Sequence, residues 1–373
     1  MKVLIAPDKF KGTLSAAEAA SAMADGVLRV YPDAQVQLLP MADGGEGTLE
    51  AALAAGAAEH TDRVVGPLDR EVTASWAMFE RPDRKTAVIE TARASGLLLT
   101  EPSVQSALAA HSYGSGQLIE AALNAGATEI VLGVGGSAMT DGGSGALRAL
   151  GLSIYNDGGA EVLLGGAALA TAELLDASGL DPRLAEIVIR IAADVANPLY
   201  GPDGAAHVFG EQKGADAVSR RLLDEALQHW AQLLLQATGR DVNVAGAGAA
   251  GGFPSGFMAL ADARVERGFE VVADLLGLDA ALAGADLVLT GEGSLDRQSE
   301  FGKVPLSVAG RAHARGIPAV VVAGQISLAP GKLAEYGVHA AASLVEAARS
   351  EEQAMAHAAR YVTLATQHAL EGA

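Results

Sequence analysis

The chain has 373 residues, half of them hydrophobic and only 4% aromatic, and its formal net charge is −19. A charge of this sign repels nucleic acid and anionic membranes, so we expect neither as a partner. No cysteine is present, which excludes disulfides, thiolate nucleophiles and cysteine-bound zinc. No uncharged apolar run reaches the roughly 18 residues of a membrane span, and the apolar N-terminal stretch is too short for a signal peptide. We therefore expect a cytoplasmic protein.

The N-terminal region alternates strand and helix patterns. Residues 3–7 form an apolar run ended by proline, which predicts a buried strand. Ser15 and Glu18 have the spacing of a capping box and predict the start of a helix. Residues 36–40 predict a second strand, and a glycine-rich loop then leads into an alanine-rich helix. This order is typical of a parallel sheet.

The pattern changes near residue 62. Short β-like runs at 63–65, 72–76 and 86–89 are separated by turn residues, which predicts an antiparallel or mixed sheet. Further helices are expected at 116–125 and 219–237, and further strands at 129–133 and 187–192.

Strand and helix patterns alternate again near the C-terminus. Strands are expected at 286–290, 319–323 and 338–343, and a final helix at 351–370. The simplest architecture is an α/β fold in which residues 1–62 and 282–373 form one doubly wound parallel-sheet domain. Residues 63–281 would form an inserted second α/β domain with a mixed sheet. A ligand is expected between the domains, outside the carboxyl ends of the strands.

Five clusters of glycine and polar residues fall at predicted strand ends or in loops. The strongest signal lies at 133–143, because so much glycine costs stability unless the backbone must turn sharply or approach a ligand. Successive backbone N–H groups there are typical of an anion nest. Taken singly, the other clusters are as well explained by capped turns and solvated loops. They lie at 6–15, 41–48, 193–201 with 209–215, and 290–298 with 302–305.

Other enzyme classes leave weaker patterns in this sequence. Two G-x-G-x-x-G/A matches, at 133–138 and 246–251, are discounted as dinucleotide sites. Gly142 and Gly143 interrupt the helix that the first one requires, and Phe253-Pro254 would break the second. The histidines lack the spacing of a zinc motif, and no G-x-S-x-G elbow indicates a serine hydrolase.

Taken together, the clusters resemble the bacterial type I glycerate kinase family. The matching segments occur in family order, span nearly the whole chain, and lie at 6–15, 40–48, 135–143, 194–201, 208–215, 246–252 and 290–298 with 302–305. The chain departs from the common family pattern at Lys9, Met139-Thr140, Glu211 and Ser294-Leu295, which bears on substrate preference more than on reaction type.

The resemblance implies an enzyme, a phosphotransferase with an alcohol group as acceptor. It implies transfer of the γ-phosphoryl group of ATP to D-glycerate, with 2-phosphoglycerate as the expected product. It also implies that the doubly wound domain is flavodoxin-like. ATP and Mg²⁺ are the expected cofactors. The sequence does not give the oligomeric state.

The role of each residue is assigned from its chemistry, and the five clusters could hold these roles in a different arrangement. Asp43 is the candidate to accept the hydroxyl proton. Asp194, which ends a buried strand where a carboxylate is desolvated unless paired, and Asp296 are the candidate Mg²⁺ ligands. The expected charge-neutralising residues are Lys9, Lys11 and Lys303. The expected nucleotide-binding residues are Gly135, Gly136, Ser137, Asp141, Gly142, Gly143, Asn197 and Glu292.

Two alternatives remain open at this point. One is an NAD-dependent dehydrogenase of a small hydroxy acid, which would use one of the glycine fingerprints and bind NAD(H) instead of ATP. The other is a non-catalytic two-lobed ligand-binding protein, which would bind glycerate without turnover.

Overall fold

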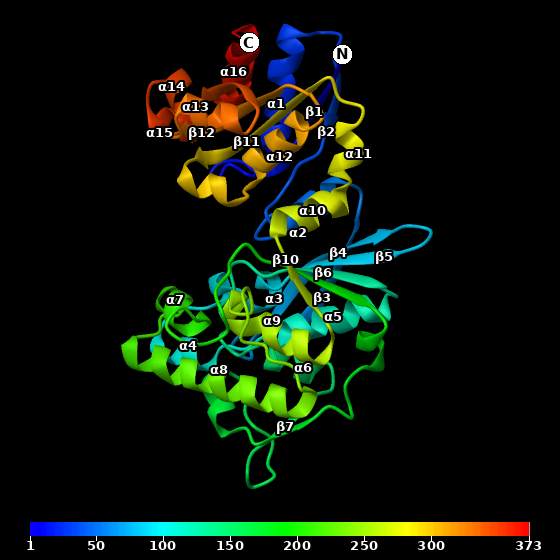
Figure 1. Cartoon of the computed structure of the whole chain (residues 1–373), viewed down its shortest axis with the longest axis vertical. Coiled ribbons are helices and arrows are strands. Elements are labelled where there is room, and N and C mark those ends of the chain that lie inside the picture. Colours follow the sequence, from blue (N-terminus) through cyan, green and yellow to red (C-terminus); the bar gives the residue numbers. More distant parts are fainter. Residues whose placement is uncertain (373) are drawn as a thin grey trace. The chain divides into compact units, whose positions relative to one another are not determined.

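The computed structural model describes residues 1–372, and the chain divides into two compact units (Figure 1). Unit 1 comprises residues 1–43, 50–56 and the segment from 269 onward. Unit 2 comprises residues 44–49 and 57–268. The chain therefore passes from one unit to the other four times.

Unit 1 is built on a five-stranded sheet in which every pair of neighbours is parallel. Its strand order is β13-β12-β11-β1-β2. The bounds are β1 (Lys2–Ile5), β2 (Gln35–Leu38), β11 (Leu287–Leu295), β12 (Ala319–Ile326) and β13 (Val338–Ser343). Numbered within the unit, this order is 2-1-3-4-5, that of a flavodoxin-like doubly wound sheet. The expected fold of this domain is confirmed.

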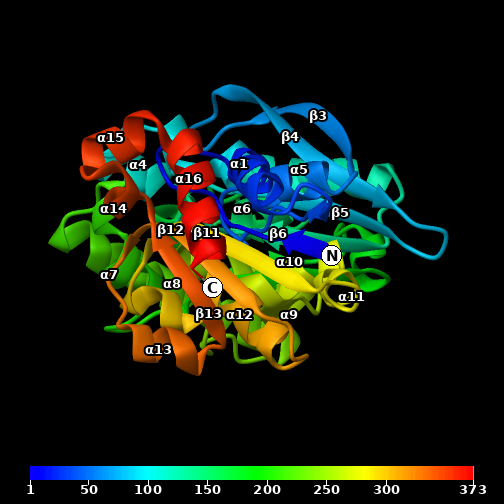
Figure 2. The same ribbon diagram turned by 90° about the horizontal axis from the view of Figure 1, so that it is seen from above.

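Helices cover both faces of this sheet because successive strand residues point to opposite sides. On one face Val3 and Ile5 pack with residues of α1 (Ala16–Val30) and α16 (Ala358–Glu371). On the other face Leu4 packs with residues of α10 (Gly268–Leu276) and α12 (Val304–His313). Helices α1 and α16 lie side by side in both views (Figures 1 and 2). The remaining helices here are α2 (Thr48–Ala54), α11 (Leu278–Leu282), η5 (Arg297–Phe301), α13 (Pro330–Glu335), α14 (Leu344–Ala348) and α15 (Glu351–Ala356).

Unit 2 holds a six-stranded mixed sheet of order β10-β9-β6-β5-β4-β3. Strands β3, β4 and β5 pair antiparallel, and β5, β6, β9 and β10 pair parallel, as the change of pattern predicted. The bounds are β3 (Ala58–Val65), β4 (Glu71–Glu80), β5 (Lys85–Glu90), β6 (Glu129–Gly133), β9 (Val188–Ala192) and β10 (Arg264–Glu266), with a separate antiparallel pair, β7 (Ser153–Tyr155) and β8 (Leu174–Asp176).

The helices of unit 2 enclose one apolar core that includes Trp76, Trp230 and Phe253. The amphipathic helix expected at 219–237 is present as α8. The α-helices are α3 (Ala92–Ser95), α4 (Val104–Ala109), α5 (Tyr113–Asn124), α6 (Ser144–Ala149), α7 (Ala205–Phe209), α8 (Ala217–Thr238) and α9 (Ala249–Leu260); the 3-10 helices are η1 (Leu97–Leu99), η2 (Ala167–Thr171), η3 (Pro182–Ala185) and η4 (Glu211–Lys213).

The chain passes between the two units at 43/44, 49/50, 56/57 and 268/269, and not at the expected domain boundaries of 62/63 and 281/282. The first expected boundary falls inside β3, which pairs with β4 along its whole length, so β3 cannot be divided. Residues 269–281 belong to unit 1 because Phe269 and Leu278 lie in its core. Residues 44–49 belong to unit 2, although their neighbours in sequence do not.

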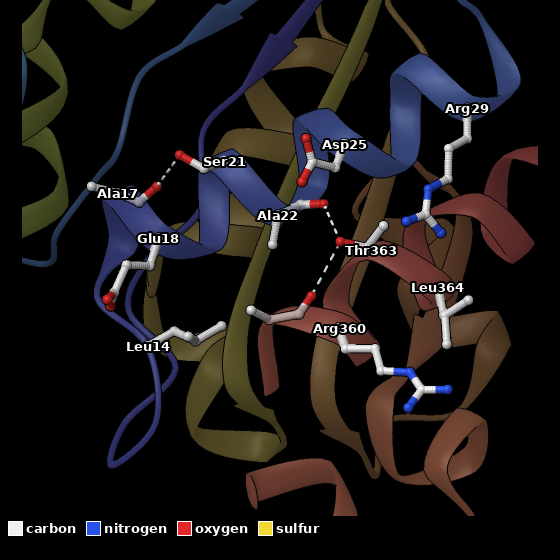
Figure 3. A pocket seen from close by; sticks show the side chains of 11 residues that line it. Leu14, Ala17, Glu18, Ser21, Ala22, Asp25, Arg29, Arg360, Thr363 and Leu364 are labelled. Carbon is white, nitrogen blue, oxygen red and sulfur yellow. Dashed lines mark hydrogen bonds between the residues drawn. The ribbon is translucent and has the colours of Figure 1, made fainter. Parts of the chain in front are cut away.

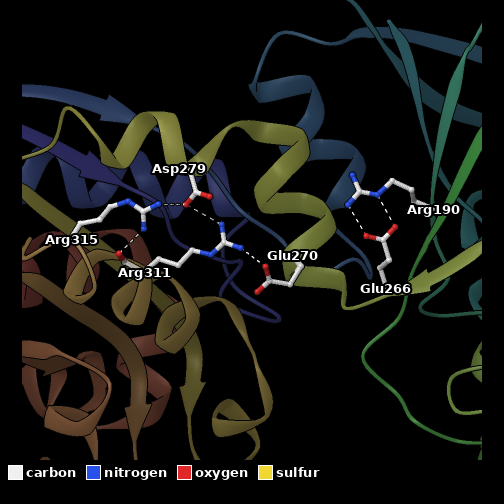
Figure 4. Close-up of polar contacts among 6 residues, drawn as sticks. All are labelled: Arg190, Glu266, Glu270, Asp279, Arg311 and Arg315. Carbon is white, nitrogen blue, oxygen red and sulfur yellow. Dashed lines mark hydrogen bonds and ion pairs between the residues drawn. The ribbon is translucent and has the colours of Figure 1, made fainter.

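Ion pairs fix the chain on each side of the passage at residues 268–269 (Figure 4). In unit 2, Arg190 of β9 donates to Glu266 of β10 through Nε at 2.9 Å and Nη2 at 2.8 Å. In unit 1, Arg311 of α12 pairs with Glu270 of α10 and with Asp279 of α11, the latter at 3.2 Å. Ion pairs therefore hold the segment before residue 268 to unit 2 and the segment after it to unit 1.

Three local expectations were wrong. Strand β11 continues to Leu295, beyond the glycines expected to end it, because Glu292 and Ser294 still pair with β12. The final helix is two helices, α15 and α16, separated at His357. Pro254 does not break α9, because the left-handed residues 250–252 come before it and it lies in the first turn of the regular part.

In the described part of the chain, no helix is both long and apolar enough to cross a membrane.

Candidate functional site

A cluster of charged residues lies at the switch point of the unit 1 sheet, where β1 and β11 are neighbours. Asp8 lies three residues after the end of β1, and its backbone N–H donates to the carbonyl of Gly291 in β11 at 2.8 Å. Glu292 is the next residue of β11. In doubly wound sheets the ligand crevice opens at this switch point, because the connections on either side of it run to opposite faces.

The two carboxyl groups of this cluster are both buried. Asp8 is 7% exposed and Glu292 is 5% exposed. Burial raises the pKa of Asp8 to about 7, with further contributions from the charges of Asp43 and Glu292, against the lowering effect of Lys9. Burial also raises the pKa of Glu292, although the Ser299 hydroxyl donates to it at 2.5 Å and Lys303 lies near it. Each group resists ionisation chiefly because burial disfavours its charged form, and the negative charges of neighbouring carboxylates add to this effect.

The structure brings together most of the residues predicted for this half of the site. Asp43 is half-buried and close enough for its charge to raise the pKa values of Asp8 and Glu292. Lys303 Nζ lies 3.7 Å from Glu292 Oε2. Lys9 is half-buried beside Asp8, while Lys11 is exposed and forms no ion pair with a described residue. Asp296 receives a hydrogen bond from the Ser294 hydroxyl at 3.3 Å.

Sequence reasoning missed Asp8 as a member of this cluster. It lies within the first glycine and lysine motif, three residues after the end of a buried strand. A carboxylate three residues beyond the first strand of a doubly wound sheet is a usable signal, because that strand borders the switch point.

An open anion nest lies in unit 2 immediately after β6. Among the described residues, no acceptor pairs with the backbone N–H groups of Gly135, Gly136 or Ser137. Gly136 has φ +73° and is exposed, and only the Ala92 side chain lies near the position of its missing Cβ. Consecutive N–H groups in a loop with a left-handed residue are suited to binding an anion.

The second half of the same loop, residues 141–143, is packed against the protein interior. Only part of the phosphate-binding segment predicted at 135–143 can therefore bind a ligand. Asp141 is fully buried, and its carboxylate accepts hydrogen bonds from the Ser112 N–H and hydroxyl, both at 2.8 Å. It also accepts from the N–H groups of Gly143 and Gly145. The missing Cβ of Gly142 would meet Trp230, and that of Gly143 would meet the Phe253 carbonyl. Asp141, Gly142 and Gly143 therefore shape the loop from inside, and Gly135, Gly136 and Ser137 remain as its open part.

Lys213 lies underneath this loop and was not among the predicted site residues. It is 3% exposed, and its Nζ donates to the Met139 carbonyl at 2.6 Å and to the Ser137 hydroxyl at 3.4 Å. Burial lowers its pKa to about 8, against the raising effect of the Asp141 charge. Lysine is exposed in most folds, so the motif at 209–215 indicated a turn more readily than a buried cation.

Glu90, at the end of β5, was also missed. One of its oxygens accepts from the N–H groups of Gly47 at 2.9 Å and Leu49 at 3.0 Å, and the other accepts from Arg93 at 3.0 Å. A protein carboxylate thus already occupies the first N–H groups of α2. The glycine-rich loop at 44–47 is therefore held by Glu90, and these two N–H groups are not open to a phosphate.

Asp194 and Asn197 have surroundings different from those expected. Asp194 is exposed, not desolvated, and its Oδ1 accepts from the backbone N–H of Gly268 at 2.9 Å. The side-chain amide of Asn197 donates to the Asp203 carbonyl at 2.9 Å and closes its own loop. The expectation that Asp194 must be paired or metal-bound because of burial was wrong, since the strand ends before it, at Ala192.

No group of three or more His, Asp or Glu side chains in residues 1–372 has an arrangement that could hold a metal ion by itself. Asp194 belongs to unit 2 and Asp296 to unit 1. Mg²⁺ is commonly held by one or two carboxylates together with waters and substrate phosphates, so the carboxylates present fit that manner of binding.

A separate groove of about 790 Å³ lies between α1 and α16 in unit 1 (Figure 3). Asp25 and Arg29 of α1 and Arg360 of α16 line it, so its charges are of mixed sign. None of the predicted site residues contributes to this groove.

The fold and these sites define a class of protein: a two-unit α/β enzyme that handles small anionic molecules. One unit has a charged cluster at its switch point, and the other has an open anion nest. Comparison with known proteins then identifies the family. The chain belongs to the glycerate kinase family, whose sequence model matches residues 3–371, and the resemblance found in the sequence is confirmed.

Individual relatives agree along nearly the whole chain. The protein is 45% identical over 348 residues to a glycerate 2-kinase of Escherichia coli (strain K12), covering 92% of this chain and 91% of the relative. It is 42% identical over 366 residues to a glycerate kinase of Bacillus subtilis (strain 168), covering 97% and 95%. A crystal structure from Salmonella typhimurium LT2, provisionally assigned as glycerate kinase 2, matches with a TM-score of 0.88 and 39% identity and covers 100% of this chain and 98% of that one. The dehydrogenase and the non-catalytic binding protein find no support in these comparisons.

Proposed function

We propose that this protein is a glycerate kinase that transfers the γ-phosphoryl group of ATP to D-glycerate and forms 2-phosphoglycerate. The observation that carries the proposal is the similarity along nearly the whole chain to a relative named glycerate 2-kinase, 45% identical over 92% of this chain. Family membership and the absence of support for the alternatives agree with a kinase that acts on glycerate.

The open nest of unit 2 is the candidate phosphate site. The unpaired N–H groups of Gly135, Gly136 and Ser137 supply donors that need no side chain to order, so an anion bound there loses little to reorganisation. Asp141 keeps the loop in this shape by holding its far end. The nucleotide phosphates are the anion that we assign to this nest.

The switch-point cluster of unit 1 is the candidate site of the acceptor hydroxyl. In the transfer, a glycerate hydroxyl oxygen attacks the γ-phosphorus, and the bond to the β–γ bridging oxygen breaks with its electron pair leaving on ADP. The hydroxyl proton passes to a carboxylate, for which Asp43 is the candidate. Asp8 lies close enough to Asp43 for the two carboxyl groups to affect each other's protonation. Lys9, Lys11 and Lys303 are the candidates to offset the charge of the carboxylate and the phosphoryl group.

Asp194 and Asp296, which the sequence suggests, stay the candidate protein ligands of Mg²⁺, because one or two carboxylates with waters and substrate phosphates suffice to hold this ion. When bound, Mg²⁺ neutralises phosphate charge and orients the phosphoryl group for in-line transfer. A cytoplasmic location stays a prediction from the sequence.

The test is ADP release and product analysis with D-glycerate, ATP and Mg²⁺. Phosphorus NMR of the product distinguishes 2-phosphoglycerate from 3-phosphoglycerate, because the phosphate is coupled to one methine proton in the first and to methylene protons in the second. The proposal is overturned if a saturating panel of hydroxy acids of three to six carbons, D-glycerate included, gives no ADP above background.

A further inference from the structure

The buried lysine beneath the open nest has no counter-ion. Among the described residues, Lys213 forms no ion pair, and its hydrogen bonds go to two uncharged acceptors, the Met139 carbonyl and the Ser137 hydroxyl. Asp141 is the charged group whose field reaches it, and it lies beyond ion-pair distance, with its carboxylate engaged by Ser112, Gly143 and Gly145. A buried ammonium group that lacks a carboxylate partner is costly for the fold.

The position of this charge relates it to the nest. Ser137 supplies the third unpaired N–H group of the nest, and its hydroxyl lies 3.4 Å from Lys213 Nζ. Lys213 is 3% exposed, so solvent screens its charge weakly, and the field reaches the exposed side of the loop through low-dielectric protein. A buried cation whose acceptors are both uncharged, below N–H donors that no described residue occupies, is complementary to an anion bound above it.

We propose that Lys213 is the buried cation of the phosphate site: it positions the Ser137–Met139 segment and supplies the positive charge that attracts the nucleotide phosphates into the nest. This inference rests on the proposed kinase function and names a residue that the function did not include. Lys213 does not contact the phosphate in this arrangement, and it acts through Ser137 and through its electrostatic field.

The lowered pKa of Lys213 supplies a measurable consequence. Near pH 8 the ammonium group is partly deprotonated, because its pKa is about 8. An anion bound in the nest stabilises the charged form and raises this pKa, so nucleotide binding should take up as much as about half a proton at pH 8. On its own segment, Glu211 pairs with Arg220 at 3.4 Å, and Asp216 caps α8 by accepting from the Ser219 N–H at 2.7 Å.

Calorimetric titration of the whole protein tests this inference, with MgATP and D-glycerate titrated separately at pH 8 in buffers of different ionisation enthalpy. Lys213→Gln keeps a donor for the Met139 carbonyl but removes the charge, and Lys213→Met removes both. Lys85→Met is the matched control, because Lys85 is an exposed lysine of the same unit, paired with Glu80 at 2.7 Å.

We expect Lys213→Gln to melt no lower than the wild type, because it removes a costly buried charge, to weaken MgATP binding by at least about tenfold and to abolish proton uptake. Lys85→Met should match the wild type in all three. Wild-type MgATP affinity and proton uptake in Lys213→Gln overturn the inference, and so does a loss confined to the D-glycerate titration. If Lys213→Met fails to fold, Lys213→Gln alone decides between these outcomes. A wild-type protein that binds neither ligand overturns the kinase proposal instead, so the two failures are distinguishable.

Discussion

The carboxylate of Asp141 accepts hydrogen bonds from both the backbone N–H and the hydroxyl of Ser112, each at 2.8 Å. Together with Gly143 and Gly145, these donors give a fully buried carboxylate four hydrogen bonds. Asp141→Ala would leave several buried donors unpaired, and we expect it to lower the free energy of unfolding by about 3–5 kcal/mol. Urea denaturation would measure this loss. A stable Asp141→Ala protein that had lost only nucleotide affinity would contradict the internal role of this residue.

The two halves of the glycine-rich loop should respond differently to an added methyl group. Gly143→Ala places a Cβ 2.4 Å from the Phe253 carbonyl at φ +76°, so we expect a loss of several kcal/mol in unfolding free energy. Gly136→Ala meets only the Ala92 side chain at 3.5 Å and should cost about 1–2 kcal/mol for its left-handed backbone. It should also raise the Kd for MgATP. Unchanged nucleotide affinity in a folded Gly136→Ala protein would exclude the nest as the phosphate site.

Replacement of Lys303 should affect turnover more than folding. Lys303 is one-third exposed and lies 3.7 Å from Glu292, so Lys303→Ala should leave the fold intact. We expect kcat to fall by about 10²–10³, the effect of losing one transition-state electrostatic contact. Lys303→Arg should recover part of this, since a planar guanidinium group does not reproduce a compact ammonium.

Steady-state kinetics with both substrates varied would measure the effect of Lys303→Ala. The variant also removes a charge that lowers the pKa of Glu292, so that pKa should rise further. Near-normal kcat and KM for both substrates would remove Lys303 from the site and favour Lys9 or Lys11 in its place.

The pKa of Asp8 gives a stability prediction with a definite sign. This pKa is raised from 3.8 to about 7, so between these values the folded protein holds a proton that the unfolded chain releases. Its contribution to the free energy of unfolding therefore falls as the pH rises through this window. Asp8→Asn removes the ionisable group, so it should match the wild type near pH 4 and exceed it by a few kcal/mol above pH 7.

Glu18→Gln is the control of opposite sign for the Asp8 experiment. Hydrogen bonds from Ser15 lower the pKa of Glu18, so its contribution is present at neutral pH and lost as the pH falls. Denaturation midpoints from pH 8 to well below pH 4 would measure both variants, because Glu18 loses its contribution only below its ordinary pKa of 4.5. An Asp8→Asn protein that is no more stable than the wild type at pH 8 would contradict the burial of an ionised carboxylate in the switch-point cluster.

Asp194→Asn separates a structural role from a metal-binding role. Asparagine keeps the oxygen that accepts from Gly268, so the stability should change by less than about 0.5 kcal/mol. If Asp194 is a Mg²⁺ ligand, the concentration of Mg²⁺ for half-maximal rate should increase. Asp262→Asn is the control, because Asp262 is exposed and paired with Arg240. An unchanged Mg²⁺ requirement would exclude Asp194 as a Mg²⁺ ligand.

Local patterns predicted local structure well in this chain. The capping box of Ser15 and Glu18 is present as expected, because its hydrogen bonds join residues only three positions apart in the chain. Turn residues and short β-like runs also predicted the change to antiparallel strands, which was expected near residue 62 and begins at residue 58. The expected end of β11 was wrong because pairing with β12, a distant segment, overrides the local preference of glycine.

Burial of individual polar residues could not be predicted in the same way. A strand-end aspartate was expected to be buried and a lysine in a loop to be exposed. The structure shows the reverse, because Asp194 is exposed and Lys213 is buried. Their surroundings come from Gly268 and from the Ser137–Met139 segment, which are 74 or more residues away. Such contacts depend on how the elements pack, and periodicity along one segment contains no information on them.

The division of unit 1 into separate segments affects how the chain folds during synthesis. Strand β1 lies inside its sheet and must pair with β11, whose residues are made 284 positions later. At ordinary translation rates that interval lasts roughly 15 to 60 s. Unit 2 lies almost wholly within residues 57–268 and can form first, while the apolar N-terminal strand has β2 beside it but stays without its second partner, β11. The newly made N-terminus is therefore the segment most in need of a chaperone, and ribosome profiling of chaperone occupancy should show it held until β11 emerges.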